Sequence, residues 1–324
     1  MGDVHTRMYR DGRLVEQHFP LASVSERLAM PDTTVWIDLC GPSEAQLQLL
    51  APSLELHELA LADVLSRQRP KLDRYDTHLF LSCHAARVDV DAGRLDEAEV
   101  DVFIGRRWLI TVRKNPAFQI EPVLERWDRS SDLAVDGVGF LLYGLLDVVV
   151  DSYFDATQRF DEFYELISEG MFAQQRLDPL RQRQWFDMTR ALFRFHRMVV
   201  PMREVCGSLV RREHNSVPEK LSPYFQDVYD HVVGVIDDLD SLREVASTIL
   251  ETDVSLRDHR QNRVMKQVSS WAAILAVPTL VTGYYGMNVP YPGSGEVVGV
   301  LTSAGVMIVA CIVLYHLFRR NHWL

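Results

Sequence analysis

The sequence predicts an α+β domain, a long stalk helix after it and a two-helix transmembrane hairpin at the C-terminus. Three observations indicate this order. Short β-like runs are confined to the first third of the chain, a long apolar heptad without proline follows, and the last 58 residues are almost free of charge. We expect segment boundaries at residues 1–130, 131–266 and 267–324.

Charge is distributed very unevenly along the 324 residues. Residues 1–266 hold 32 basic and 44 acidic side chains, which leaves a net charge of −12, whereas residues 267–324 hold only Glu296, Arg319 and Arg320. An acidic surface argues against a nucleic-acid partner, because neutralising phosphates requires basic groups. An acidic surface instead attracts metal cations.

The first segment alternates β-like runs with a helical stretch, Glu55 to Arg67, which indicates an α/β module. The expected strands are Val35–Leu39, His78–Val88, Glu99–Ile104 and Trp108–Val112. No Walker loop, dinucleotide fingerprint or GxSxG elbow occurs in it, so we do not expect an enzyme. Asp89 to Gly93 looks like half of an EF-hand loop but lacks its later ligands, so we expect a hairpin turn there.

The four cysteines lie far apart and have no histidines at metal-ligand spacing. We expect them to be reduced packing residues: Cys40, Cys83, Cys206 and Cys311.

The second segment predicts three helices: residues 138–171, residues 179–212 with a bend at Pro201, and residues 222–286. The third carries an apolar heptad: Val228, Val232, Val235, Leu239, Leu242, Ala246, Ile249 and Leu256. Acids recur on another line every seven residues: Asp230, Asp237, Glu244, Glu251 and Asp258. These acids are either the solvated face of a coiled coil or a surface that concentrates divalent cations.

Two uncharged stretches, of 20 residues from Gln267 to Gly286 and of 22 residues from Val297 to Phe318, predict membrane crossings. The alternative, a buried hairpin in a soluble core, is disfavoured because neither stretch has a charged face. Basic residues flank the hairpin on one side only: Arg257, Arg260, Arg263, Lys266, Arg319 and Arg320. The positive-inside rule therefore places both termini in the cytoplasm and residues 287–296 outside.

The first crossing has a stripe of small or weakly polar residues at helical spacing: Asn262, Met265, Ser269, Ala272, Ala276, Thr279, Gly283 and Gly286. Such a stripe indicates either close helix packing in lipid or the wall of a pore. Two crossings cannot enclose a channel, so a pore requires several copies of the chain.

Several motifs are more specific. Tyr285-Gly286-Met287-Asn288 directly follows the first crossing, and the chain ends in Arg319-Arg320-Asn321-His322-Trp323-Leu324. Upstream stand Tyr224 to His231 at the start of the stalk, and Asp63 with Arg67 to Lys71. Together these features, which cover essentially the whole chain, resemble the CorA family of magnesium and cobalt transport proteins.

The resemblance implies a funnel-shaped homopentameric channel in the cell membrane, with an α+β cytoplasmic domain in each subunit. It would take up mainly Mg²⁺, driven by the membrane potential and gated by intracellular Mg²⁺. The outer entrance would be Gly286, Met287 and Asn288 beside Tyr285. The pore lining would be Thr279, Ala276, Ala272, Val268, Met265 and Asn262, with the register open between Val268 and Ser269.

The same resemblance implies a regulatory magnesium site between subunits, where Asp227 of one chain faces Asp89 of the next. One departure concerns the outer loop. Many members carry Met-Pro-Glu-Leu there, whereas this chain runs from Val289 to Glu296 without it, and we expect Glu296 to attract cations instead.

Other functions remain open at this point. Co²⁺ or Ni²⁺ could accompany Mg²⁺ as cargo. A proton-coupled zinc transporter, similar to the ZntB branch that shares the Gly-Met-Asn signature, is the alternative transporter. A membrane-anchored metal sensor that does not conduct is the alternative from another class.

Overall fold

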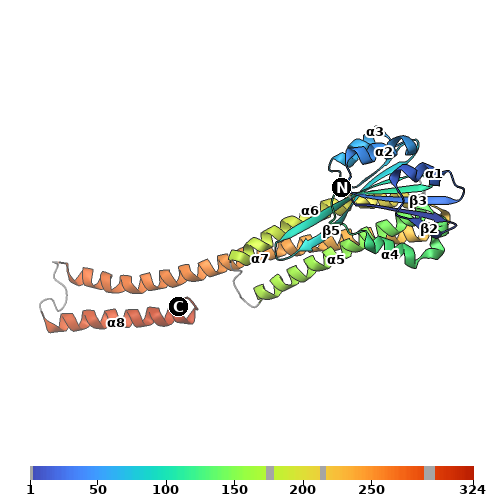
Figure 1. Ribbon diagram of the computed structural model, residues 1–324. Helices are drawn as coiled ribbons and strands as arrows, with labels where there is room; N and C mark the ends of the chain where they lie inside the picture. The colour runs from blue at the N-terminus through green and yellow to red at the C-terminus, as the bar shows by residue number, and fades with distance from the viewer. Residues whose placement is uncertain (1–2, 173–178, 212–216, 288–295) are drawn as a thin grey trace. The chain divides into compact units, whose positions relative to one another are not determined.

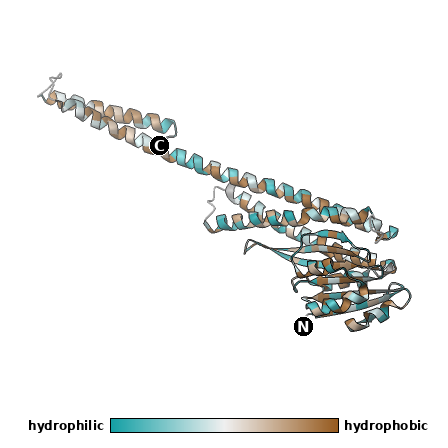
Figure 2. Ribbon diagram, turned by 90° about the horizontal axis from the view of Figure 1, so that it is seen from above, coloured by the Kyte–Doolittle hydropathy of each residue, from teal (hydrophilic) through white to brown (hydrophobic). Residues whose placement is uncertain are grey.

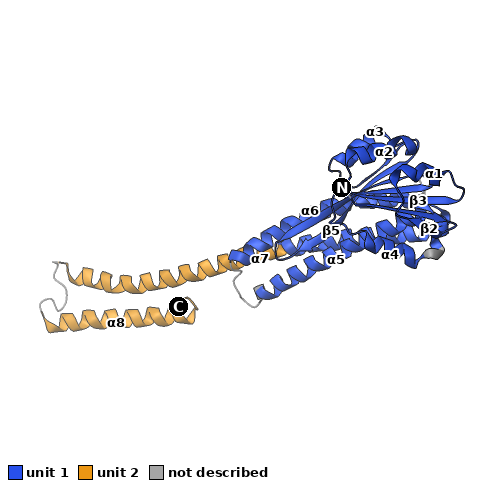
Figure 3. Ribbon diagram, viewed as in Figure 1, with its two compact units in different colours: residues 1–247 blue, residues 248–324 orange. Residues whose placement is uncertain are grey.

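The computed structural model describes residues 3–172, 179–211, 217–287 and 296–324 (Figure 1). The chain forms two compact units, residues 1–247 and 248–324 (Figure 3). The helix α7 (Ser222–Tyr285) begins in the first unit and ends in the second. The segment boundaries expected from the sequence, after residues 130 and 266, stay predictions.

The first unit is built on a seven-stranded sheet in the order β2-β1-β3-β7-β6-β5-β4. Its strands are β1 (Asp3–Arg10), β2 (Arg13–Gln17), β3 (Thr33–Cys40), β4 (Lys71–Arg74), β5 (Leu79–Asp89), β6 (Arg94–Ile104) and β7 (Trp108–Arg113). β3 and β7 pair in parallel, and the other neighbours pair antiparallel. The four expected strands are confirmed as β3, β5, β6 and β7.

Three further strands were not expected from the sequence, because they are short or rich in polar residues: β1, β2 and β4. A signal for the first pair was present, because Asp11-Gly12 joins β1 to β2 with positive φ at both residues, 51° and 75°. An Asp-Gly pair in this conformation is typical of a tight hairpin. The turn expected at Asp89 to Gly93 is confirmed, since Asp89 pairs with Arg94 across the β5–β6 hairpin.

Helices cover both faces of the sheet (Figure 1). On one face lie α1 (Val24–Leu28), α2 (Glu44–Leu54) and α3 (Glu58–Leu65). Residues of β3 such as Val35, Ile37 and Leu39 form a core with α2 and α3. The other face carries α4 (Glu121–Arg129), α5 (Val138–Phe172) and α6 (Pro179–Val210). The described residues also form three short 3₁₀ helices: η1 (Leu21–Ser23), η2 (Ser131–Asp136) and η3 (Glu219–Leu221).

The expected helices are found with small changes at their ends. α6 runs through Pro201 without interruption, and the expected helix from Glu55 begins three residues later, because the ring nitrogen Nδ1 of His57 caps it by accepting from the N–H of Leu59. The four cysteines are free thiols as predicted, three of them buried and Cys311 half-buried.

The apolar heptad of α7 is confirmed as a packing face as far as Ile249. The heptad positions Val228, Val232, Val235 and Leu239 are fully buried, whereas Leu256 is 43% exposed. In the first unit this face lies against α5 and α6, where Tyr224 contacts Tyr143 and the imidazole Nε2 of His196 lies 3.2 Å from Asp240 Oδ1. The five acids at seven-residue spacing are all exposed.

The second unit consists of the rest of α7 and of α8 (Val297–Arg320). Both helices are long and apolar enough to cross a membrane. Figure 2 shows the change in composition along α7, from mixed residues to a largely hydrophobic end that α8 accompanies.

A buried ion pair joins the two parallel strands of the sheet. Asp38 in β3 is fully buried, and its Oδ2 accepts from Arg113 Nη2 at 2.6 Å at the end of β7. Thr111 donates to Asp38 Oδ1 at 2.7 Å, and Arg113 donates to the carbonyl of Phe118 at 2.9 Å. Both oxygens of the buried carboxylate therefore accept hydrogen bonds, as burial of a charge requires.

We expect Arg113→Met to destabilise the protein by about 3–5 kcal/mol, because the variant leaves the Asp38 carboxylate buried without a counter-charge. The double variant Asp38→Leu/Arg113→Met should recover most of this loss, since no unpaired charge remains. Thermal unfolding of the full chain in detergent measures both. A double variant no more stable than Arg113→Met would contradict the assignment.

Candidate functional site

The residues predicted to line a pore share one exposed face of α7. Asn262, Met265, Val268, Ala272, Ala276 and Thr279 are all exposed. Val268 and Ser269 are exposed alike, so both helical registers remain open.

α8 packs against a different face of α7 within the second unit. Ser270 is fully buried and Val281 is 8% exposed, and the Cys311 thiol of α8 donates to the carbonyl of Ile274 at 3.7 Å. With 3.6 residues per turn, Ser270, Ile274 and Val281 project on the side of the helix roughly opposite Ala272 and Thr279. Packing with α8 therefore does not explain the stripe of small residues.

The end of α7 forms the described part of the predicted entrance. The N–H of Gly286 donates to Thr282 at 2.9 Å, and the N–H of Met287 donates to Tyr284 at 3.3 Å. A Cβ at Gly286 would lie 2.9 Å from the carbonyl oxygen of Thr282, which makes a larger residue unfavourable there. Tyr285 is the last residue of the helix, and Met287 is 56% exposed.

Of the two other residues predicted near the entrance, Asn288 and Glu296, the structure describes Glu296. Asn288 lies outside the described residues. Glu296 is exposed and directly precedes α8. A carboxylate at this position is favourable, because the N-terminal end of a helix carries partial positive charge.

The two predicted regulatory acids are both in the first unit. The Asp89 carboxylate accepts from the N–H of Ala92 at 3.0 Å, which holds the side chain at the tip of the β5–β6 hairpin. Asp227 lies on α7, where its side chain is 60% exposed and 3.7 Å from His231 Nε2. Their pairing would join neighbouring subunits, so it stays a prediction. Within the described part of the chain, no three His, Cys, Asp or Glu side chains are grouped to hold a metal ion.

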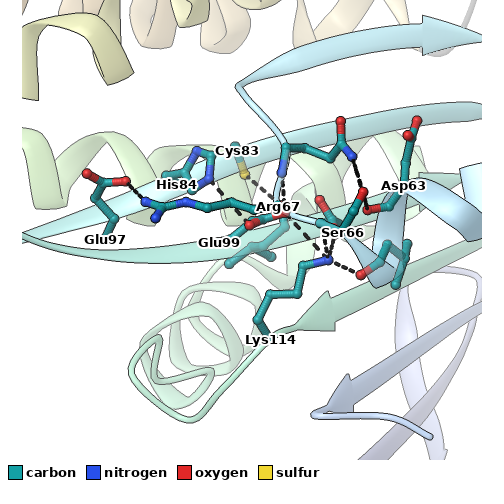
Figure 4. Close-up of polar contacts among 12 residues, drawn as sticks. Asp63, Ser66, Arg67, Cys83, His84, Glu97, Glu99 and Lys114 are labelled. Carbon is teal, nitrogen blue, oxygen red and sulfur yellow. Dashed lines mark hydrogen bonds and ion pairs between the residues drawn. The ribbon is translucent and has the colours of Figure 1, made fainter. Parts of the chain in front are cut away.

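A buried polar network that the sequence analysis missed lies in the first unit (Figure 4). Lys114, directly after β7, places its Nζ 2.8 Å from Asp101 Oδ2 and 3.5 Å from Glu99 Oε1. Lys114 also donates to the carbonyl of Ser66, at 3.1 Å, just beyond α3. The network thus ties the end of α3 to the sheet.

The same network borders a cavity of about 530 Å³. Arg67 and Arg194 both bind Glu97 at its edge, and His84 Nε2 lies 3.7 Å from Glu99 Oε2. A sequence signal was available, since Glu97, Glu99 and Asp101 alternate along β6 and must share one side of the strand.

Burial raises the pKa of Asp101 to about 6, although the ammonium of Lys114 partly offsets this effect. Burial acts on Glu99 in the same direction, but the nearby imidazole of His84, a hydrogen bond from the N–H of Gln68 and the charge of Lys114 leave the pKa of Glu99 lowered. The two neighbouring carboxyl groups therefore differ in charge state at mildly acidic pH.

Comparison with known proteins decides the family. The sequence pattern described as "CorA-like Mg2+ transporter protein" matches residues 31–320. The chain belongs to this CorA-like family. Recognition of the family from the combined sequence features is thereby confirmed.

Individual CorA-like proteins are similar over nearly the whole chain. The cobalt/magnesium transport protein CorA of Thermotoga maritima is 26% identical over 337 aligned residues, which cover 99% of this chain and 95% of that protein. The structure of the CorA magnesium transporter from Methanocaldococcus jannaschii has a TM-score of 0.79 at 21% identity and covers 99% of this chain and 98% of that chain. The ZntB cytoplasmic domain from Vibrio parahaemolyticus has a TM-score of 0.58 at 12% identity, over 80% of this chain and 98% of that one.

These structural similarities establish the fold of the CorA-like chain. The expected combination of an α+β domain, a long helix and a C-terminal apolar hairpin is confirmed. The number of subunits and the roles of the pore residues stay predictions.

For Asp101 we expect a stability contribution that falls as pH rises. Its pKa is about 6 in the folded protein against an ordinary value of 3.8, so the folded state binds the proton more tightly. The contribution is therefore greatest below about pH 4 and is lost by about pH 6, by about 3 kcal/mol in total.

The measurement is the melting temperature of the wild type relative to Asp101→Asn between pH 4.5 and 7. The wild type should lose stability relative to the variant as pH rises through this range. A constant difference would show that Asp101 does not titrate there.

Proposed function

We propose that copies of this chain assemble as a homopentamer that conducts Mg²⁺ across the cell membrane into the cytoplasm. The observation that carries the proposal is the exposed face of α7, from Asn262 to Thr279, which is uncharged, combines small, apolar and weakly polar residues and lies away from α8. In a ring of subunits this face would surround a conduit. Both termini would be cytoplasmic.

An uncharged path suits a hydrated magnesium ion. Mg²⁺ gives up its water reluctantly, so neutral oxygens can hold the ion through its hydration shell and still release it. A ring of carboxylates would bind the ion more tightly. We assign Gly286, Met287 and Asn288 to the outer entrance beside Tyr285, and Glu296 to the attraction of cations toward it.

The membrane potential supplies the driving force. Each elementary charge gains about 2.3 kcal/mol per 100 mV, so an ion with two charges gains about 4–5 kcal/mol on entering an inside-negative cell. Co²⁺ and Ni²⁺ carry the same charge, and the uncharged path provides no group that rejects them. We therefore assign Mg²⁺ as the main cargo and Co²⁺ or Ni²⁺ as further cargo.

The acids Asp89 and Asp227 would supply regulation. Asp227 is 60% exposed on α7, so it is accessible to a neighbouring subunit. Intracellular Mg²⁺ bound between Asp227 and Asp89 of that neighbour would favour the closed state. Loss of the ion would shift the population toward open channels, because the ion binds the closed state more tightly.

The alternative is zinc transport coupled to protons, as in a ZntB-like protein. It predicts proton flux that starts when zinc is added. Liposomes loaded with a pH indicator distinguish this coupling from passive Mg²⁺ flux, and the absence of any metal flux would instead favour a sensor.

We expect two variants to abolish Mg²⁺ uptake into liposomes while the pentamer still assembles. Asn288→Ala removes the proposed entrance amide, and Ala276→Phe fills the proposed conduit. Val309→Phe is the matched control, because Val309 is 61% exposed on α8 and lies outside the conduit. Unchanged uptake by Asn288→Ala, or equal loss in Val309→Phe, would contradict the assignment.

For Asp227→Ala we expect weaker inhibition of uptake by magnesium on the cytoplasmic side, with a roughly tenfold higher concentration needed for half-inhibition. Asp230→Ala, an exposed acid on the same helix, is the control. The measurement is flux against internal Mg²⁺, and an unaltered inhibition curve for Asp227→Ala would remove the regulatory role.

A further inference from the structure

Pro278 interrupts the hydrogen bonding of α7 inside its apolar stretch. Proline has no N–H, so the carbonyl of Ile274, four residues earlier, loses its helical donor. Within lipid no water replaces that donor, and an unsatisfied carbonyl is unfavourable. The protein must therefore supply a donor from elsewhere.

The donor in the structure is the thiol of Cys311. Its Sγ lies 3.7 Å from the Ile274 carbonyl oxygen, across the contact between α8 and α7. The nearby hydroxyls are engaged elsewhere, since Thr279 donates to Leu275 at 3.1 Å and Thr282 donates to Pro278 at 2.8 Å. The half-buried thiol and the proline thus form a matched pair on facing helices.

The contact between the helices extends on both sides of Pro278. Toward the inner end, Ser270 is fully buried. Toward the outer end, a groove of about 290 Å³ separates α7 from α8, lined by Val281, Thr282, Tyr285, Gly286, Gly299, Val300, Ser303 and Met307. The outer end of α7, which carries Gly286, therefore packs on α8 through Val281, with open space beside this contact.

We propose that the Cys311 thiol and the Ile274 carbonyl form a latch that fixes α8 to α7 at the proline and so positions the outer end of α7. Cys311 is a positioning residue in this proposal, since it does not lie on the face assigned to the conduit. The effect on transport rests on the proposed function, whereas the latch itself does not.

The first test is spectroscopic and independent of transport. The S–H stretching band of Cys311 is obtained as the infrared difference between the wild type and Cys311→Ala, with the full chain in lipid nanodiscs. We expect a band shifted below the frequency of a free thiol. A band at the free-thiol frequency would overturn the latch.

The second test is a double-mutant cycle with Pro278→Ala, which restores an N–H to the Ile274 carbonyl. Cys311→Ala should lower the melting temperature in the wild-type background and have no effect in the Pro278→Ala background. Ser303→Ala is the matched control, because Ser303 donates within its own helix, to Val300, and its effect should be the same in both backgrounds. An equal effect of Cys311→Ala in both backgrounds would contradict the latch.

The third test concerns positioning. We expect Cys311→Ala to change Mg²⁺ flux at least threefold, a size consistent with one hydrogen bond between membrane helices, and to leave flux unchanged in the Pro278→Ala background. If the first two tests succeed and the wild type carries no Mg²⁺, the transport proposal fails and the latch stands. If flux is present but insensitive to Cys311, the positioning role fails.

Discussion

The constraint on which the membrane part depends is that a helix in lipid must satisfy its polar groups within the protein. The threonines of the apolar stretch meet it by donating to carbonyls of their own helix, as Thr279 and Thr282 do. Pro278 leaves the carbonyl of Ile274 without a donor from its own helix, and the Cys311 thiol of α8 supplies one. Because α8 engages the side of α7 that holds Ile274, the small-residue face of α7 is left uncovered, and that face is where transport is proposed to take place.

Charged side chains are arranged differently in the core of the first unit, along the exposed surface of α7 and in its apolar stretch. In the first unit, buried charges occur in partnered groups, as with Asp38 and Arg113 or with Lys114 between Glu99 and Asp101. The acids along α7 remain exposed, where they can attract cations without the cost of burial. The apolar part of α7 carries no charge. A divalent ion would thus meet carboxylates in water and neutral groups in the proposed conduit, which favours passage over tight binding.

The polar network around Lys114 makes the first unit sensitive to pH. Lys114 and Glu99 contact the segment that follows α3, through the carbonyl of Ser66 and the N–H of Gln68. Since Asp101 has a pKa of about 6, the charge inside this network changes under mildly acidic conditions. The stability of the connection between α3 and the sheet is therefore coupled to pH, through groups distant in sequence from the membrane hairpin.

The sequence by itself determined the two apolar crossings, the heptad face of α7 and the strands β3, β5, β6 and β7, because each depends on hydrophobic periodicity within one segment. The Tyr285 to Asn288 motif, together with the two crossings, the basic C-terminal end and the upstream segments, indicated the family. Only the structure placed β1, β2 and β4, whose short or polar sequences carry little periodicity: β1 pairs with β2 and β4 with β5 across short turns, and β1 also pairs with β3. It alone brought Glu99 and Asp101 to Lys114 and Cys311 to Ile274. Such contacts join residues far apart in the chain, and local patterns do not specify which distant groups will meet.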